Sequence, residues 1–420
     1  MKKIVLSLAG VMAAVAFAPE ASALPAFARQ TGMACSACHN QHFPVLNGFG
    51  RAFKAAGYTM MGAQEKIEGE HLSLPATLNA AILFKGRYQK DNTAKALPLN
   101  ALAPGDGHVQ FGDEFSLFFG GRVAENVGFL FEGNTAAVGG QLLAGFKMPF
   151  NIETPVANIA IVPFTTDALD AQYGYELSSG GVMRANRWAE HRRETSAIQY
   201  NAGAGAATGL ALAAKNEMGF VAYTRFSPNF GMGANGGALP SYSLGSNLFR
   251  IAATPEVAGF ALVTGLSHMN GTSTVGAGAL VGVENKTEQT YFDLQAQGAV
   301  GENEVSIYAQ YAVAPKTNAV TLIPNAYNPG TLDRKAFTLG ADYSVIPHTL
   351  HVGGAYRNAK NGVADVNGAN QSDNAVTVTV VYDMVQNVAF HLNHSAYSGT
   401  ARNAVGAQKR LTTLMLEAAW

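Results

Sequence analysis

Cysteine and charge are both scarce in this chain. Two cysteines in 420 residues exclude a framework of several disulfides and a structural zinc centre built on four cysteines. Charged residues make up 14% of the chain, against about 25% in an average soluble protein. The formal net charge of −1 argues against a nucleic-acid partner, because phosphate binding requires a basic surface.

Long apolar runs are missing beyond the first residues. Lys2-Lys3, the apolar stretch Ile4 to Phe17 and the small residues Ala21-Ser22-Ala23 have the order of a secretory signal. That stretch is shorter than the about 20 residues of a transmembrane helix, and no later stretch reaches about 18. We therefore expect residues 1–23 to be a signal peptide, the mature chain to begin at Leu24, and no helix to span a membrane.

Glycine and strand-like alternation are what the chain has in abundance. There are 46 glycines, about 11% against a usual 7% or so. From Leu78 to Gln89 the even positions are apolar or glycine, while Asn79, Lys85 and Arg87 occupy odd ones. This period of two predicts a strand with one apolar and one polar face. The alternation returns at 111–123, 127–131, 292–300, 305–313, 337–345, 350–356, 376–382, 388–392 and 411–420.

Two kinds of connection join these predicted strands. Tight turns such as Ala124-Glu125-Asn126 alternate with long polar segments, as in outer-membrane barrels, which have short periplasmic turns and long outer loops. The final strand ends in Trp420, like the terminal strand of bacterial outer-membrane barrels. The sequence predicts an all-β fold: a transmembrane outer-membrane β-barrel of about 16 antiparallel strands over residues 75–420, with a lumen for water or a plug. The long segments are roughly 91–110, 166–192, 226–246, 268–287, 314–334, 358–374 and 395–409.

Both cysteines belong to one motif, Cys35-Ser36-Ala37-Cys38-His39, the attachment sequence of a c-type haem. The thiols of Cys35 and Cys38 add to the haem vinyl groups, and His39 becomes the proximal iron ligand. Three alternatives compete with one covalent haem c. The first is a thioredoxin-like redox pair, which is disfavoured because no βαβ pattern surrounds the motif. The second is half of a zinc site, which is disfavoured because the chain has no second C-x-x-C. The third is a structural disulfide, which an exported chain permits.

Residues 24–74 are predicted to form a small helical c-type cytochrome segment. Its apolar residues after the motif recur at helical spacing and are expected to cover one face of the haem; they are Val45, Leu46, Phe49 and Phe53. About 50 residues bury little core, so the segment is expected to depend on the barrel for support. Arg29, Arg51 and Lys54 are candidates for contacts with haem propionates or with carboxylates in the lumen.

The sixth iron ligand has several candidates. Met60 and His71 follow the predicted helix with enough chain to return to the far face of the haem. A methionine there raises the reduction potential and a histidine lowers it. His42 is expected on the same side as His39, which disfavours it. A water molecule or a residue of the barrel remains open.

Two further groups of residues have weaker predictions. One is a basic cluster that could line a constriction or lie near the outer rim: Arg184, Arg187, His191, Arg192 and Arg193 around Trp188. The other consists of two H-x-x-H pairs, His348 with His351 and His391 with His394. Residues three apart on a strand face opposite sides, so these pairs do not predict a metal site.

The N-terminal segment resembles a known family, the outer-membrane monohaem cytochrome–porin fusions of iron-oxidising bacteria. Beyond the motif, the residues that carry the resemblance are Pro25-Ala26-Phe27-Ala28-Arg29-Gln30-Thr31-Gly32, Phe43-Pro44, Leu46, Phe49-Gly50-Arg51, Phe53-Lys54 and Gly57-Tyr58. Over the barrel the likeness is one of architecture and size. It implies electron transfer from an extracellular donor, ferrous iron first, through one haem c to a periplasmic carrier such as a soluble cytochrome. As an enzyme, the chain would be a ferrous-iron-oxidising oxidoreductase.

The size of the haem constrains where it can work. It is much shorter than the apolar band of about 25 Å that an outer-membrane barrel presents to lipid. The haem segment is therefore expected inside the barrel, entering from the periplasmic side of the bacterial outer membrane. One alternative is a diffusion porin whose haem-containing plug gates or stabilises the channel. Another is haem catalysis such as peroxide reduction, which requires an open sixth position.

Overall fold

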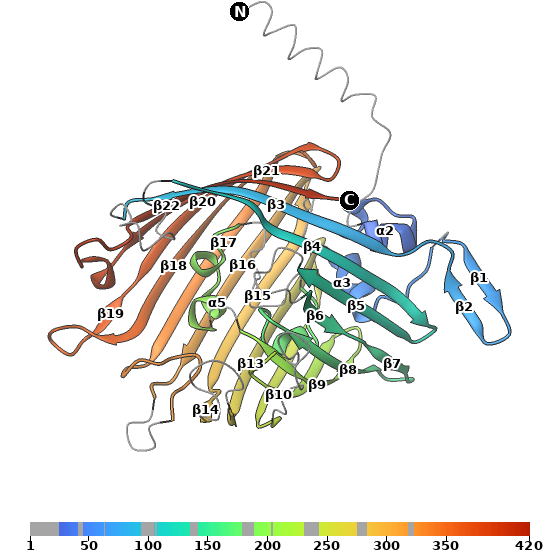
Figure 1. Ribbon diagram of the computed structural model, residues 1–420, viewed down its shortest axis with the longest axis horizontal. Coiled ribbons are helices and arrows are strands. Elements are labelled where there is room, and N and C mark those ends of the chain that lie inside the picture. Colours follow the sequence, from blue (N-terminus) through green and yellow to red (C-terminus); the bar gives the residue numbers. More distant parts are fainter. Residues whose placement is uncertain are drawn as a thin grey trace, which may run out of the picture.

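A closed antiparallel β-barrel dominates the structure (Figure 1). The computed structural model describes residues 25–40, 45–62, 64–93, 105, 107–134, 142–178, 189–202, 205–230, 243–274, 284–317 and 323–420. Within these residues the wall has 16 strands, which confirms the predicted fold class and strand number for the barrel. The predicted signal sequence and Leu24 lie outside the described residues.

Each strand of the wall pairs with its neighbours in the sequence. The strands are β3 (Ala80–Asp91), β4 (His108–Ala124), β5 (Val127–Asn134), β6 (Leu143–Lys147), β7 (Phe150–Glu153), β8 (Asn158–Thr166), β9 (Ala207–Lys215), β10 (Gly219–Ser227), β11 (Ser246–Ala253), β13 (Phe260–Thr274), β15 (Gln289–Val300), β16 (Asn303–Ala314), β17 (Arg334–Ile346), β18 (Leu350–Ala364), β20 (Asn374–Val385), β21 (Val388–Ser398) and β22 (Arg410–Ala419). β6 and β7 form one interrupted strand, because β5 and β8 pair with both. Three short pieces extend the hairpins: β12 (Glu256–Val257), β14 (Glu284–Lys286) and β19 (Asn370–Ser372).

The last strand closes the barrel against the first. Leu416 of β22 lies opposite Gly86 of β3. The N–H of Trp420 donates to the carbonyl of Ile82 at 3.0 Å, and the N–H of Ile82 donates back at 2.7 Å. The prediction of a terminal barrel strand ending at the tryptophan is confirmed. Closure leaves no sheet edge with unpaired backbone groups, which an apolar membrane requires.

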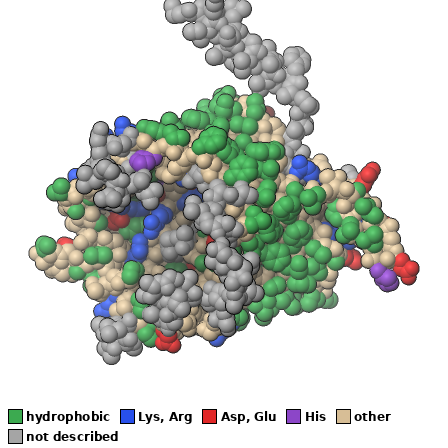
Figure 2. Space-filling model, viewed as in Figure 1, with side chains coloured by type: hydrophobic (Ala, Val, Ile, Leu, Met, Phe, Trp, Pro, Cys, Tyr) green, Lys and Arg blue, Asp and Glu red, His purple; other side chains and the backbone are tan. Residues whose placement is uncertain are grey.

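The two faces of the wall differ as the alternation predicts. On β20, Val376 and Val378 are 52% and 54% exposed on the outside, whereas Thr377 and Thr379 are buried on the inside. Figure 2 shows hydrophobic side chains gathered in a band over the outer face. An apolar exterior around a polar interior is the arrangement of an outer-membrane barrel.

The long β8–β9 connection folds into the lumen. It contains η3 (Ala171–Tyr173), α4 (Arg192–Thr195) and α5 (Ala197–Ala202). Ile198 is fully buried in a cluster that includes residues of β16 and β17. The N–H of Ala197 donates to Thr338 Oγ1 at 3.1 Å. This connection therefore packs on the inner wall, as Figure 1 shows for α5.

The N-terminal helices are short and lie at one end of the barrel (Figure 1). They are α2 (Pro25–Thr31), η1 (Cys35–Ala37) and α3 (Gly48–Ala55). The rings of Phe27, Phe53 and Tyr58 pack together, with centroids 5.1 to 5.9 Å apart. None of the described helices is long and apolar enough to cross a bilayer. A cytochrome identity for this segment stays a prediction.

The predicted apolar face after the motif is wrong. Asn47 caps α3, so Val45 and Leu46 precede the helix and helical spacing does not apply to them. Val45 is buried with Tyr308 of the barrel, Phe53 lies in the aromatic cluster, and Phe49 is exposed. These side chains therefore do not form one surface.

A hairpin that the sequence did not reveal separates α3 from the barrel. Its strands are β1 (Lys66–Gly69) and β2 (Leu72–Pro75), with Ile67 opposite Leu74. The hairpin projects beyond the barrel end (Figure 1). Its four-residue strands gave too short a pattern to recognise.

Candidate functional site

The C-x-x-C-H motif forms a single helical turn. The N–H groups of Cys38 and His39 both donate to the carbonyl of Cys35, at 3.0 and 2.9 Å. A helical turn brings residues three apart onto one face, so both cysteine side chains can meet one flat group. The sulfurs are not bonded to each other. Burial, and secondarily the neighbouring Cys35, raises the pKa of the Cys38 thiol.

Asn47 and Gly50 fasten α3 to this turn. The side-chain oxygen of Asn47 accepts from the Gly50 N–H at 3.0 Å, and its Nδ2 donates to the carbonyls of Ser36 and Ala37 at 3.2 and 3.1 Å. A Cβ at position 50 would overlap the carbonyl oxygen of Cys38, so only glycine permits this approach. The turn and α3 are thus one packed unit.

Three side-chain contacts attach the unit to the short-turn end of the barrel. Asn40 Nδ2 donates to the carbonyl of Val305 at 3.3 Å, and Arg51 Nη1 donates to that of Ala261 at 2.9 Å. Gln386 Nε2 lies 3.2 Å from Cys35 Sγ. Val305 and Ala261 closely follow tight turns, and Gln386 lies within one. The motif is therefore held at the mouth where the short turns cluster.

A buried ionic group joins the N-terminal segment to the lumen connection. Lys54 forms an ion pair with Glu176, and Lys147 Nζ lies 3.5 Å from the other oxygen of that carboxylate. The Lys54 and Glu176 side chains are only 10% and 2% exposed. The expectation that Lys54 meets a carboxylate in the lumen is confirmed.

The two arginines predicted to contact propionates differ in their surroundings. Arg29 Nη1 donates to the carbonyl of Ala80 at the start of β3. Arg51 is buried, and burial lowers its pKa to about 10 although Tyr308 opposes this shift. Its Nε and Nη2 have no hydrogen-bond partner among the described residues. Buried guanidinium donors of this kind suit a carboxylate.

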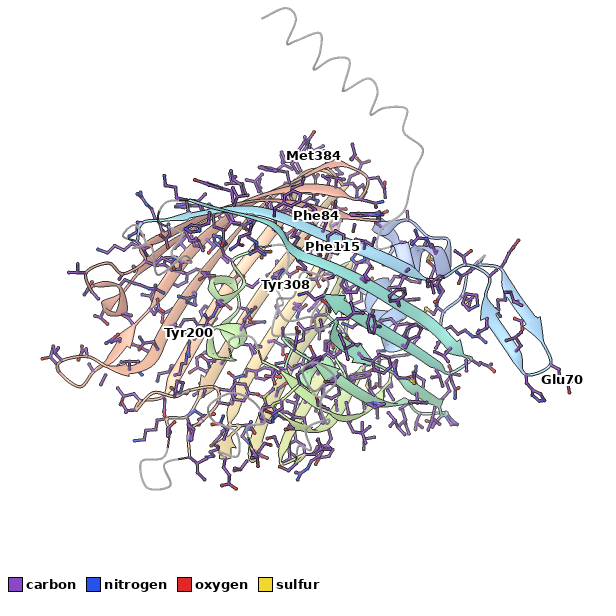
Figure 3. The ribbon with its side chains drawn as sticks, in the orientation of Figure 1. Glu70, Phe84, Phe115, Tyr200, Tyr308 and Met384 are labelled. Carbon is purple, nitrogen blue, oxygen red and sulfur yellow. The ribbon has the colours of Figure 1, made fainter. Side chains whose placement is uncertain are left out.

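The candidate sixth ligands lie in different places. Met60 is partly exposed at the end of the N-terminal segment, and its carbonyl accepts from Gln30 Nε2 at 2.8 Å. The side chain of His71 is 92% exposed beside Glu70, which Figure 3 labels at the tip of the projecting hairpin. The structure does not bring His71 to the motif. His42 lies outside the described residues.

The motif fits a haem better than its alternatives. A disulfide is not formed, and no cluster of three His, Cys, Asp or Glu in the described chain is arranged around a metal ion. An antiparallel barrel supplies no βαβ unit for a thioredoxin-like pair. Two unlinked thiols on one helical turn and a following histidine are the features that covalent attachment of a haem c uses, and the buried donors of Arg51 are compatible with a propionate; the haem itself stays a prediction.

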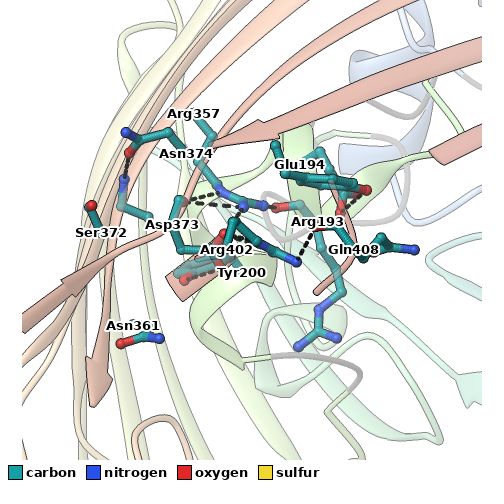
Figure 4. A network of polar contacts seen from close by, with 12 residues as sticks. Arg193, Glu194, Tyr200, Arg357, Asn361, Ser372, Asp373, Asn374, Arg402 and Gln408 are labelled. Carbon is teal, nitrogen blue, oxygen red and sulfur yellow. Dashed lines mark hydrogen bonds and ion pairs between the residues drawn. The ribbon is translucent and has the colours of Figure 1, made fainter. Parts of the chain in front are cut away.

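A second polar centre lies deeper in the lumen (Figure 4). Tyr200 of α5 donates to Asp373 Oδ2 at 2.9 Å, and Arg402 Nε donates to Oδ1 at 2.7 Å. Arg357 donates to Asp373 Oδ1 at 3.3 Å and to the carbonyl of Arg193 at 2.9 Å. Burial and the neighbouring Asp373 raise the pKa of Tyr200 to about 12. This network fixes the connection to the wall.

The predicted basic cluster belongs in part to the same region. His191 hydrogen-bonds through Nδ1 to Ser395 at 2.6 Å and through Nε2 to Thr413 at 2.7 Å. Arg192 pairs with Glu190 at 3.3 Å. These described members line the lumen, which favours the constriction over the outer rim. Arg184, Arg187 and Trp188 lie outside the described residues.

Sequence reasoning missed the groups that hold the motif in place. Asn47, before a short helix, carries an N-cap signal that could have been found. Gln386 and Glu176 carry none, because their proximity to the motif arises only when distant segments meet in the barrel.

Comparison with solved structures supports the barrel. The outer-membrane channel DcaP of Acinetobacter baumannii matches with 10% identity over 82% of this chain and 97% of its own, with a TM-score of 0.50. OmpTdeltaL8, a loop L8 deletion mutant of the Vibrio cholerae outer-membrane protein OmpT, matches with 12% identity over 82% of this chain and 99% of its own (TM-score 0.47). The outer-membrane protein OpdK of Pseudomonas aeruginosa matches with 11% identity over 81% and 98% (TM-score 0.43).

These comparisons define a fold class and no more. At 10% identity, the likeness to DcaP shows the fold alone, an outer-membrane-type β-barrel. No family model matches the sequence, and no curated protein matches it. What the chain does must be argued from its own residues.

Proposed function

We propose that this chain is an outer-membrane electron-transfer protein, in which a barrel holds one covalent haem c at its short-turn mouth. The observation that carries the proposal is the C-x-x-C-H turn packed between α3 and the β20–β21 turn. Short turns face the periplasm in outer-membrane barrels, so the mouth is open to a soluble periplasmic acceptor. The bound haem would supply a one-electron carrier. The donor is extracellular, and ferrous iron is our first candidate.

The residues of the chain have distinct tasks in this proposal. Cys35 and Cys38 would hold the haem covalently, and the imidazole of His39 would ligate its iron. The Nε and Nη2 groups of Arg51, which have no hydrogen-bond partner among the described residues, would donate to a haem propionate. Asn47 and Gln386 keep the turn at the mouth. The barrel would hold this site at its short-turn mouth, with outer-membrane lipid around the wall.

The test uses full-length protein matured with haem in a bacterial periplasm and purified in detergent. We expect haem to stay with the polypeptide on a denaturing gel, and to be lost in Cys35→Ala/Cys38→Ala. Stopped-flow mixing of the oxidised protein with ferrous iron, without oxygen, should give rapid reduction of the haem absorbance. Haem-loaded protein that ferrous iron leaves oxidised would refute iron as the donor. A wild-type chain that carries no covalent haem would refute the whole proposal.

A diffusion channel is the second candidate, favoured by the channel-type barrel. Here the N-terminal segment would gate or stabilise the channel. Planar-bilayer recordings separate the two functions, because a large steady ion conductance in the intact, haem-loaded protein indicates a porin. A protein that is reduced by the donor but conducts little indicates the electron-transfer function. Peroxide turnover would instead indicate haem catalysis at an open sixth position.

A further inference from the structure

Two histidines meet one glutamate at the short-turn end of the inner wall. His348 lies in the β17–β18 turn with a φ of 55°, and not on a strand. The strand rule that separates H-x-x-H pairs holds for His391 and His394, but it is wrong for His348 and His351. His348 Nδ1 lies 2.6 Å from Glu304 Oε1, and His351 Nε2 lies 3.8 Å from Glu304 Oε2.

His351 is buried, and the two described carboxylates beside it lie beyond an ordinary hydrogen-bond distance. Its side chain is 1% exposed, and neither ring nitrogen has a partner within hydrogen-bond distance in the described chain. Asp342 Oδ2 lies 3.7 Å from Nδ1, on the opposite side of the ring from Glu304. A buried imidazole between two carboxylates is costly unless something satisfies its nitrogens.

The carboxylates of this group lack a cationic lysine or arginine partner. In the described part of the chain, the ion pairs that reach Glu304 and Asp342 come from histidines. By contrast, the buried carboxylate of Asp293 in the wall faces the guanidinium of Arg250 at 2.6 Å. Unlike the guanidinium of Arg250, a histidine does not carry a permanent positive charge that offsets the negative charge of a carboxylate. A divalent cation would compensate it.

We infer that His348, His351 and Glu304 form a binding site for a first-row divalent transition-metal ion, with Asp342 orienting His351. Two histidines and one carboxylate are a donor set suited to ferrous iron and also to zinc or cobalt. In metal sites, the ring nitrogen of a histidine that does not bind the metal commonly donates to a carboxylate, which fixes the orientation of the ring. The site lies beside the N-terminal segment, because Asn40 binds the carbonyl of Val305, the residue after Glu304.

The distances suit an ion after a small adjustment. Two atoms bonded to one metal at about 2.1 Å stand between about 3.0 and 4.2 Å apart, depending on the bond angle. The 3.8 Å between His351 and Glu304 falls within this range, whereas the 2.6 Å contact of His348 must open slightly. No three such side chains in the described residues already have metal-site geometry. The side chain of His348 is 65% exposed, so it has room to rotate away from Glu304.

Cobalt binding to full-length protein in detergent, stripped of metal by a chelator, tests the site. We expect one Co²⁺ per chain, detected by its visible absorption and displaced by Zn²⁺. His351→Asn should weaken binding by at least about 100-fold, and Asp342→Asn by about 10- to 100-fold. Matched controls are His394→Asn, whose ring bonds Thr412 at 2.9 Å, and Glu302→Gln in the exposed β15–β16 turn. Both should bind as wild type does.

Two outcomes overturn the inference: wild-type protein that binds no more Co²⁺ than His351→Asn, or His394→Asn that loses as much as His351→Asn. If His351→Asn does not fold, His348→Asn in the exposed turn gives the same comparison, with the same expected loss. The experiment is repeated on the haem-free Cys35→Ala/Cys38→Ala chain, where Co²⁺ binding should persist. Failure of the haem proposal and failure of this site are thereby distinguished. That the ion is the electron donor rests on the proposed function, whereas metal binding does not.

Discussion

Glu176→Gln should release the N-terminal segment from the barrel mouth. Among the described residues, Glu176 is the carboxylate that pairs with both Lys54 and Lys147, and the substitution removes its negative charge from this buried group. Breaking a buried ion pair by removing one partner costs about 3–5 kcal/mol. The glutamine amide keeps the shape of the side chain, so the loss measures charge and not volume.

That free energy sets the size of the effect. Because about 1.4 kcal/mol changes an equilibrium constant tenfold, the population in which the segment has left the mouth should rise by roughly two to four orders of magnitude. Arg51 is buried, so trypsin cleaves after it only when the segment leaves the mouth. When opening is fast, the cleavage rate follows the open population. We expect cleavage after Arg51 in folded Glu176→Gln protein to be at least about 100-fold faster than in wild type.

A matched control lies on the projecting hairpin. Glu68 is 57% exposed and pairs with Lys66 at 3.4 Å, so Glu68→Gln should change cleavage after Arg51 by less than about fivefold. Equal cleavage rates in Glu176→Gln and wild type would refute the reasoning that this buried group holds the segment in place.

Two further predictions concern the motif turn and the lumen connection. Gly50→Ala gains about 1 kcal/mol of helix propensity, yet its Cβ overlaps the Cys38 carbonyl; we expect a net loss of about 1–2 kcal/mol, seen as faster trypsin cleavage. As a control, Ala52→Gly on the exposed face of α3 should lower the stability of the segment by only about 1 kcal/mol. A Gly50→Ala protein that resists trypsin better than wild type would contradict this packing. Burial raises the pKa of Asp170 to about 6 from an ordinary 3.8, so its ionisation destabilises the fold as pH rises through that window. Thermal unfolding should show Asp170→Asn gaining up to about 3 kcal/mol over wild type between pH 4 and 7, and a constant difference would speak against the shift.

The sequence alone was sufficient for the architecture of the wall. Side chains alternate between faces in any strand, so the pattern of Val376 to Val378 already separated the outside from the inside. Tight turns and long loops, which alternate in the sequence, became the two ends of the barrel. The motif was equally local, because its chemistry depends on residues within one turn. Local periodicity and short residue spacings can be recognised without knowledge of the fold.

Contacts across the barrel could not be predicted in this way. Gln386 reaches Cys35 across 351 positions in the chain, and Glu304 meets His348 and His351 only because β16 pairs with β17 beside the turn. His71 followed the motif closely in sequence, yet a short hairpin carries it outward. Sequence separation gives no measure of such distances.

The sequence by itself determined that this chain builds a wall of strands and carries one C-x-x-C-H motif, because both properties depend on neighbouring residues. Only the tertiary structure decided which mouth holds the turn, which carboxylate pairs with Lys54, and which histidines lie beside Glu304. Closing a sheet into a barrel fixes the strand register and thereby brings side chains far apart in the sequence to one height on the inner wall.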